Sequence, residues 1–175
     1  DCPESRGLGD VYKRQEASFY KKRGGNVLWV GHPMIDLTKK LPLKKDARTI
    51  LNLRSNQNIL LLMPASRPQE LRYVLPTFMK AAKKLQQKYP SLVVYIPSCR
   101  DAFDEIFKKA FRKYQVKGLV ISQKDSAKLK PYIYSLTKIA FCKSGTVNME
   151  LALYGIPQIV GYRAVSYTHL TLPTT

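Results

Sequence analysis

Two short stretches combine hydroxyl, basic and glycine residues in a pattern that suits a phosphate group. The first is Ser66-Arg67, which lies between an apolar run (59–63) and a helical pattern that begins at Pro68. A guanidinium at a helix N-terminus opposes the helix dipole, so Arg67 does not serve helix stability. It adds a bidentate donor beside free backbone N–H groups, which favours phosphate binding. The alternative is a capping box of Ser66 and Gln69 beside a solvated arginine.

The second stretch is Ser144-Gly145-Thr146, between an apolar run and another helical pattern. Gly145 allows a ligand to approach the backbone closely, and the two hydroxyls lie at the helix start. Glu150 follows Thr146 by four residues and therefore lies on the same helix face, one turn further in. A carboxylate there can accept hydrogen bonds from two ribose hydroxyls while phosphates meet the N-terminal amides. The alternative is ordinary capping, with Glu150 favourable to the helix dipole.

Few other residues suggest chemistry. His32 could act as a base, but a single histidine at a strand end is more often structural, and we favour that role. The three cysteines (Cys2, Cys99 and Cys142) have no CxxC spacing, and the chain has two histidines. We therefore expect no metal site and no disulfide.

The composition is that of a globular protein with an unusual charge. Hydrophobic residues make up 45% and charged residues 24%, while Lys and Arg outnumber Asp and Glu by 30 to 12, a net charge of +18. This surplus favours an anionic partner without choosing between nucleic acid, anionic lipid and a phosphorylated substrate. No apolar run approaches the roughly 20 residues of a membrane span, and no signal peptide is recognisable, so we expect a cytoplasmic protein.

Alternating elements must position the two stretches. Apolar runs predict strands at 26–30, 59–63, 92–96, 119–122, 139–142 and 158–161. Apolar residues spaced by three and four predict helices at 68–89, 103–114, 127–136 and 146–154. Pro76 is expected to kink or split the first helix. This alternation predicts an α/β, Rossmann-like parallel sheet with helices on both faces, and such sheets bind ligands at the carboxyl ends of their strands.

The two ends do not share this pattern. Residues 1–15 and 164–175 look like translated adapter or cloning sequence, so we expect them to be foreign to the fold, although ordinary frayed tails are the alternative. The domain is then 16–163, and the whole net charge of +18 falls within it.

Three strings carry a family resemblance. VGHPMID (30–36), LLLMPASRPQELRYVLPTFMKAA (60–82) and SGTVNMELALYGIPQIVGYR (144–163) resemble lipid-A-disaccharide synthases, in the family's order and spacing. Their character is similar to cyanobacterial members. The resemblance extends from about residue 16 to 163. Ala65 departs from it, because the family usually has glycine there, which slightly tightens the turn.

The resemblance implies a GT-B glycosyltransferase with two Rossmann-like domains, of which this chain is most of the C-terminal, nucleotide-sugar-binding one. It implies an inverting hexosyltransferase that moves 2,3-diacylglucosamine from UDP to 2,3-diacylglucosamine 1-phosphate, without metal or cofactor. The general base is expected in the N-terminal domain, so we name no catalytic residue and expect this fragment to be inactive alone.

The resemblance also implies a UDP site made of Ser66, Arg67, Ser144, Gly145, Thr146 and Glu150. The first two approach the diphosphate, the next three bind it at the helix N-terminus, and the last lies near the uridine ribose. Because the substrates are acylated, the resemblance implies peripheral attachment to the anionic surface of the inner membrane. No nucleic-acid partner is expected.

Two rival functions stay open. Another UDP-sugar GT-B enzyme, such as a UDP-GlcNAc transferase or 2-epimerase, would also place a carboxylate and glycine-containing turns near UDP. A basic nucleic-acid-binding module would bind with steep salt dependence that is insensitive to Arg67 and Glu150. We rank this module last, because it leaves the paired phosphate-binding turns unexplained.

Overall fold

The computed structural model describes residues 14–28, 31, 33–38, 40–64 and 67–161, which fall into two compact units, Asp1–Lys39 and Lys40–Thr175. In the first unit, the described elements are helices α2 (Arg14–Lys22) and α3 (Pro33–Leu37). The strand predicted at 26–30 is wrong for residues 26–28, which have no regular structure, and the rest of it lies outside the described residues. Leu28 is 80% exposed, and an apolar run without a pairing partner does not form a strand.

The second unit is built on a five-stranded sheet in which every pairing is parallel. The strands are β1 (Asn58–Met63), β2 (Leu92–Pro97), β3 (Gly118–Ile121), β4 (Thr137–Lys143) and β5 (Gln158–Gly161). Their order is β3-β2-β1-β4-β5, which places β1 at the centre. The continuous apolar run of β1 is explained by this position, because its four middle residues are buried.

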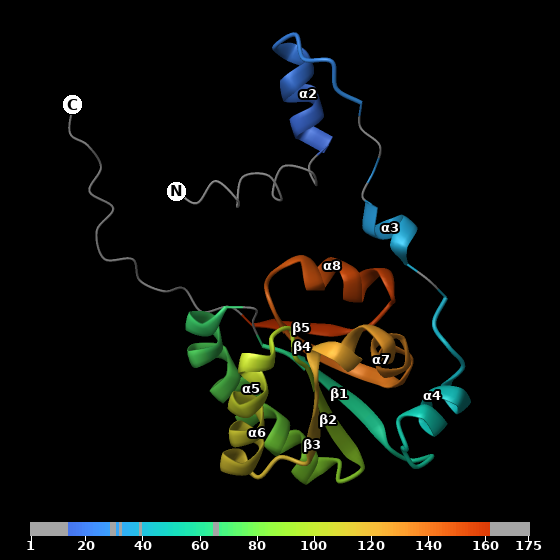
Figure 1. The fold of residues 1–175 in the computed structure, drawn as a ribbon, viewed down its shortest axis with the longest axis vertical. Helices are drawn as coiled ribbons and strands as arrows, with labels where there is room; N and C mark the ends of the chain where they lie inside the picture. Colours follow the sequence, from blue (N-terminus) through green and yellow to red (C-terminus); the bar gives the residue numbers. More distant parts are fainter. Residues whose placement is uncertain (1–13, 29–30, 32, 39, 65–66, 162–175) are drawn as a thin grey trace, which may run out of the picture. The chain divides into compact units, whose positions relative to one another are not determined.

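Helices cover both faces of this sheet (Figure 1). They are α4 (Lys44–Ile50), α5 (Pro68–Lys88), α6 (Asp101–Tyr114), α7 (Gln123–Leu136) and α8 (Thr146–Leu153). Leu60 and Leu62 of β1 pack in one core with α5 and α6. Ile59 and Leu61 point the other way and pack with α4, α7 and α8. The predicted Rossmann-like α/β fold with helices on both faces is therefore confirmed.

Local details of two helices differ from the predictions. Helix α5 is not split but continuous through Pro76, because Leu75 and Phe78 are buried on either side of the proline. Helix α7 begins four residues earlier than predicted, at Gln123. Its start is fixed by Ser122, whose hydroxyl oxygen accepts the backbone N–H of Asp125 at 3.2 Å.

The topology leaves a crevice between β1 and β4. These strands are neighbours, but β1 leads into α5 on one face of the sheet and β4 leads into α8 on the other. The two segments that follow β1 and β4 therefore run to opposite faces of the sheet. Open α/β sheets bind ligands at the carboxyl ends of two such strands. Both predicted turns follow these two strands.

Candidate functional site

A pocket of about 320 Å³ lies at the carboxyl ends of β1, β2 and β4. The segments after these three strands line it with Met63, Pro64, Arg67, Pro97, Cys99, Lys143, Ser144, Gly145, Thr146 and Val147. Strands β1 and β4 pair directly, with Met63 opposite Cys142. This pairing brings together two turns that are about 80 residues apart in the sequence.

Four of the six residues predicted for the site line this pocket, namely Arg67, Ser144, Gly145 and Thr146. Ser66 lies outside the described residues. The alternative interpretation, a capping box that begins at Ser66, is wrong, because the N-cap of α5 is Arg67, which makes no side-chain capping bond. Its exposed guanidinium is therefore not used to cap the helix. Glu150 does not line the pocket.

The β4–α8 turn presents backbone groups to the pocket. Helix α8 begins at Thr146, so the N–H groups of Thr146 and Val147 have no acceptor within the helix and lie at its positive dipole end, whereas the Asn148 N–H donates to the Gly145 carbonyl at 3.1 Å. Gly145 is extended, with φ 168° and ψ −171°, a conformation open to any residue. A Cβ on Gly145 would meet no protein atom within 4 Å. Protein packing therefore does not require this glycine, and it leaves the backbone open toward the pocket.

A hydrogen-bond network centred on Asn148 fixes this turn. The Asn148 Oδ1 atom accepts the N–H of Gly145 at 2.6 Å, and its Nδ2 atom donates to Cys142 Sγ and Gln158 Oε1, both at 3.0 Å. Gln158 Nε2 donates in return to the Asn148 carbonyl at 2.9 Å. The network joins α8 to β4 and β5. Because the Gly145 N–H is used here, the amides available to a ligand are those of Thr146 and Val147.

An ion pair joins the two turns from opposite sides of the crevice. Lys143 Nζ, at the end of β4, lies 2.6 Å from Glu70 Oε1 in the first turn of α5, and the two side chains are only 25% and 19% exposed. The carboxylate balances the lysine charge at the pocket wall. The pair also holds the N-terminus of α5 against β4.

Glu150 is held in a separate cluster between α7 and α8. Its Oε1 atom lies 2.5 Å from Lys130 Nζ. Burial, and then the charge of Glu150, raise the pKa of Tyr134 far above its ordinary value, so this phenol stays neutral. Glu150 shares a helix face with Thr146, which does line the pocket. Glu150 therefore follows the pocket-lining Thr146 by one helical turn, with its carboxylate paired to Lys130.

A comparison with protein families identifies the family of this chain. The family described as lipid-A-disaccharide synthetase matches residues 15–171 of the chain. The chain belongs to the lipid-A-disaccharide synthetase family.

Relatives in this family include cyanobacterial proteins. The chain is 47% identical over 153 residues to the lipid-A-disaccharide synthase of Prochlorococcus marinus (strain MIT 9313) and covers 39% of that relative. It is 34% identical over 154 residues to that of Gloeothece citriformis (strain PCC 7424), again covering 39%. These matches use 87% and 88% of the present chain. The chain therefore spans about two fifths of the length of these relatives.

The fold of this chain is similar to that of a solved protein structure whose assigned activity is different. A protein from Listeria monocytogenes assigned as a UDP-N-acetylglucosamine 2-epimerase matches with a TM-score of 0.57 and 16% identity. The match covers 84% of this chain and 40% of that one. At this identity the likeness concerns the fold alone.

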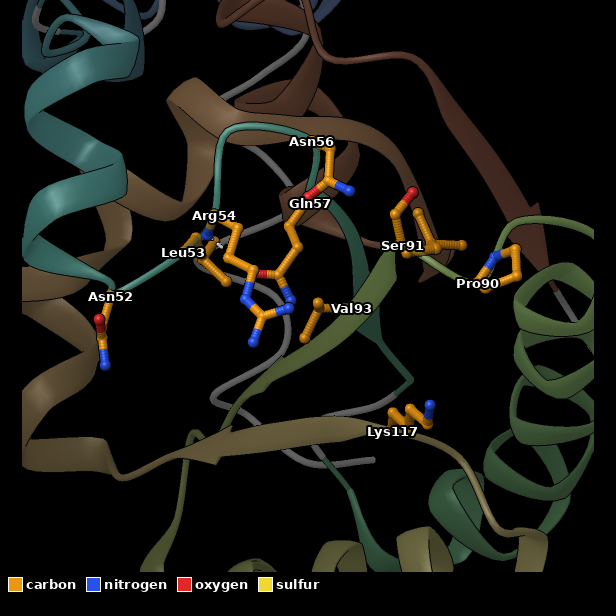
Figure 2. A pocket seen from close by; sticks show the side chains of 10 residues that line it. Asn52, Leu53, Arg54, Asn56, Gln57, Pro90, Ser91, Val93 and Lys117 are labelled. Carbon is orange, nitrogen blue, oxygen red and sulfur yellow. Dashed lines mark hydrogen bonds between the residues drawn. The ribbon is translucent and has the colours of Figure 1, made fainter.

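A larger pocket lies at the opposite edge of the sheet, at the amino ends of β1, β2 and β3 (Figure 2). It measures about 1000 Å³, and in Figure 2 its labelled side chains are spread over several separate segments. Two of its lining residues are held by hydrogen bonds: Arg48, from outside the lining, donates to the carbonyls of Arg54 and Gln57, and the Arg54 N–H donates to Gln57 Oε1. No described residue of the two predicted phosphate-binding turns lines this larger pocket.

Sequence reasoning missed three residues in or near the candidate site. Cys99 lines the pocket two residues after β2, and the carboxyl-end rule applied to this third strand would have found it. Asn148 stands three residues after Gly145, the spacing of a reciprocal cap. Lys130 carries no signal in the sequence, because only the packing of α7 beside α8 brings it to Glu150.

Proposed function

We propose that this chain binds the UDP of a nucleotide-sugar donor as part of a glycosyltransferase of lipid A biosynthesis. The observation that carries the proposal is the meeting of Arg67 with the N-terminus of α8 in one pocket at the β1–β4 crevice. Membership of the lipid-A-disaccharide synthetase family supports the identity of the nucleotide sugar.

The pocket suits the chemistry of a leaving diphosphate. When the bond from the sugar to UDP breaks, negative charge grows on the diphosphate. The dipoles of the Thr146 and Val147 amides and the charge of Arg67 stabilise that charge more in the transition state than in the ground state. Ser144 and Thr146 add hydroxyl donors. Because these groups are fixed in advance, they need little reorganisation during the reaction.

The donor is UDP-2,3-diacylglucosamine and the acceptor is 2,3-diacylglucosamine 1-phosphate, with inversion at the anomeric carbon and release of UDP. The acceptor hydroxyl needs a general base within hydrogen-bond reach. The described residues that line the pocket include no histidine and no carboxylate. In this proposal the base belongs to the N-terminal domain of the whole enzyme, so the present chain binds UDP without turnover.

The proposal includes attachment to a membrane surface. In the described part of the chain, no helix is both long and apolar enough to span a bilayer. The net charge of +18 favours an anionic lipid surface, at roughly 1 kcal/mol for each nearby basic residue. Acylated substrates place the reaction at such a surface, so we propose peripheral association with the cytoplasmic side of the inner membrane.

The test is a calorimetric titration of UDP into the full chain at physiological salt. Losing one charge-assisted contact of about 1.5–3 kcal/mol predicts that Arg67→Gln weakens binding by about 10- to 150-fold. Arg72→Gln is the matched control, because Arg72 lies on the same helix and does not line the pocket. Equal loss in both variants, or no UDP binding by the folded chain, would reject the proposal. A parallel titration with single-stranded DNA tests the nucleic-acid alternative.

A further inference from the structure

A groove lies between helices α5 and α6, which pack side by side on one face of the sheet (Figure 1). It measures about 370 Å³ and shares no lining residue with the pocket that contains Arg67. Seven of its ten lining residues are apolar or aromatic, and the other three are cations. Among the described residues, no carboxylate lines it. The groove therefore combines an apolar surface with positive charge.

The floor of this groove is apolar. Leu71 and Leu75 stand one turn apart on α5 and are only 2% and 5% exposed. Ile106 of α6 also lines the groove and is 43% exposed. A single exposed apolar side chain is ordinary on a protein surface, but Ile106 stands beside an apolar floor rather than alone. An apolar chain that covered this surface would remove it from water, which is favourable.

The rim of the groove is basic. Arg72, Lys109 and Lys113 line it, are exposed, and make no ion pair within the described part of the chain. The two lysines lie in the second half of α6, where cations favour the helix dipole, but Arg72 lies near the N-terminus of α5 and gains nothing from the dipole there. Two of the acids on these helices, Glu70 and Glu105, are already paired with lysines. The three rim cations therefore stay available to an anion.

An anionic phospholipid matches this combination. Its acyl chain can cover the apolar floor while its phosphate lies among the cations, whose long side chains reach from apolar surface to water. A nucleic acid would use the cations and leave the apolar floor uncovered. A second copy of the same surface would bring like charges together, which is unfavourable. The chemistry of the groove therefore favours a lipid surface over both of these partners.

We propose that the α5–α6 groove docks an anionic phospholipid of the membrane, with the phosphate among its three cations and the acyl chain over its apolar floor. The proposal rests on the proposed function for the attachment to a membrane, and it adds the surface that makes this attachment. It does not depend on the UDP pocket. It also gives part of the net charge of +18 a local site of action.

The test is co-sedimentation of the full chain, at physiological salt, with vesicles of phosphatidylcholine and phosphatidylglycerol in equal amounts. Each basic residue near an anionic membrane contributes about fivefold in affinity, so the double variant Lys109→Gln/Lys113→Gln should bind about 25-fold more weakly. Ile106→Gln keeps the charge and should weaken binding by about three- to tenfold, because it removes an apolar side chain that the lipid would cover. Lys124→Gln/Lys128→Gln removes the same charge from α7, on the other face of the sheet, and should bind within twofold of the wild type.

Two controls separate a lipid groove from a general attraction for anions. Vesicles of phosphatidylcholine alone should bind much less, and Ile106→Gln should leave the binding of single-stranded DNA unchanged. The proposal is rejected if the α7 double variant loses as much vesicle binding as the α6 double variant. It is also rejected if Ile106→Gln binds vesicles as the wild type does, or weakens DNA binding equally. Thermal denaturation of each variant shows whether it is folded.

A UDP titration of the same variants separates this proposal from the UDP site. All of them should bind UDP within twofold of the wild type, because none of the substituted residues lines the UDP pocket. A chain that binds UDP in an Arg67-dependent manner but does not bind the anionic vesicles would overturn this inference alone. A chain that binds the vesicles through the groove but does not bind UDP would overturn the UDP site alone.

Discussion

Replacing Gly145 by alanine separates the needs of the fold from the needs of the ligand. The backbone of Gly145 is extended, and a Cβ there would touch no protein atom within 4 Å. Alanine is a poorer residue than glycine at a helix N-cap, but it also reduces the entropy of the unfolded chain. These opposing effects are each about 0.5–1 kcal/mol, so the free energy of unfolding should change by less than about 1 kcal/mol.

The effect on the ligand should be much larger. Gly145 lines the pocket of about 320 Å³ at the start of α8, where the phosphates are proposed to lie. A methyl group forced into a filled contact typically costs about 1–3 kcal/mol. This energy corresponds to UDP binding that is weaker by about 5- to 150-fold. The loss of UDP affinity should therefore occur without a loss of stability, because the unliganded protein has room for the methyl group.

Calorimetric titration of UDP and thermal denaturation together provide the assay. Gly155→Ala is the contrasting control, because Gly155 lies outside the pocket and has φ +65°, where a side chain is strained by about 1–2 kcal/mol. It should lose stability and keep its affinity for UDP. A Gly145→Ala protein that is folded and binds UDP within twofold of the wild type would refute the placement of phosphate against this turn.

Two further predictions concern the thiols and a buried amide. Cys99 is exposed in the pocket whereas Cys142 is fully buried, and burial raises the pKa of Cys142, which lowers its reactive thiolate fraction. At pH 8, iodoacetamide should therefore modify Cys99 before Cys142, UDP should slow the modification of Cys99, and Cys142 should react only in denaturant. Peptide mass spectrometry distinguishes the two sites, and early labelling of Cys142 would contradict the prediction. The buried side chain of Gln86 donates to the carbonyls of Leu92 and Lys117 and accepts the N–H of Lys117. Gln86→Leu should therefore lower the free energy of unfolding, measured by urea titration, by about 2–4 kcal/mol. A change below about 0.5 kcal/mol would contradict this prediction.

The fold could be predicted because its strands and long helices carry strong patterns. The run 59–63 is apolar throughout, and it forms the central strand that both cores bury. The short helix Lys44–Ile50 could not be predicted, because Ala47 is its only buried residue and no apolar spacing marks it. The run 26–30 shows the opposite error. Its apolar residues satisfy the pattern, yet a strand also requires a partner, which the pattern does not contain.

The site could be predicted only as far as local rules extend. The carboxyl-end rule selects the turns at Arg67 and Gly145, since each follows a recognisable strand. The contacts that shape the pocket join residues remote in sequence. Lys143 and Glu70 are 73 positions apart, and their pairing depends on β1 and β4 being neighbours although they are not consecutive strands. Local spacing holds no information about such a pair.

The charge of the pocket follows from these long-range contacts. Lys143 lies at its wall, but Glu70 balances its charge at 2.6 Å. Under the proposed function, the remaining attraction for a diphosphate comes from Arg67 and from the amides at the start of α8, which Asn148 holds in place through Gly145. Fixed amide dipoles bind an anion without a permanent positive charge that would retain the product. Under the proposed function, in which UDP is released after each transfer, Arg67 attracts the diphosphate and rigid backbone groups stabilise the charge that develops.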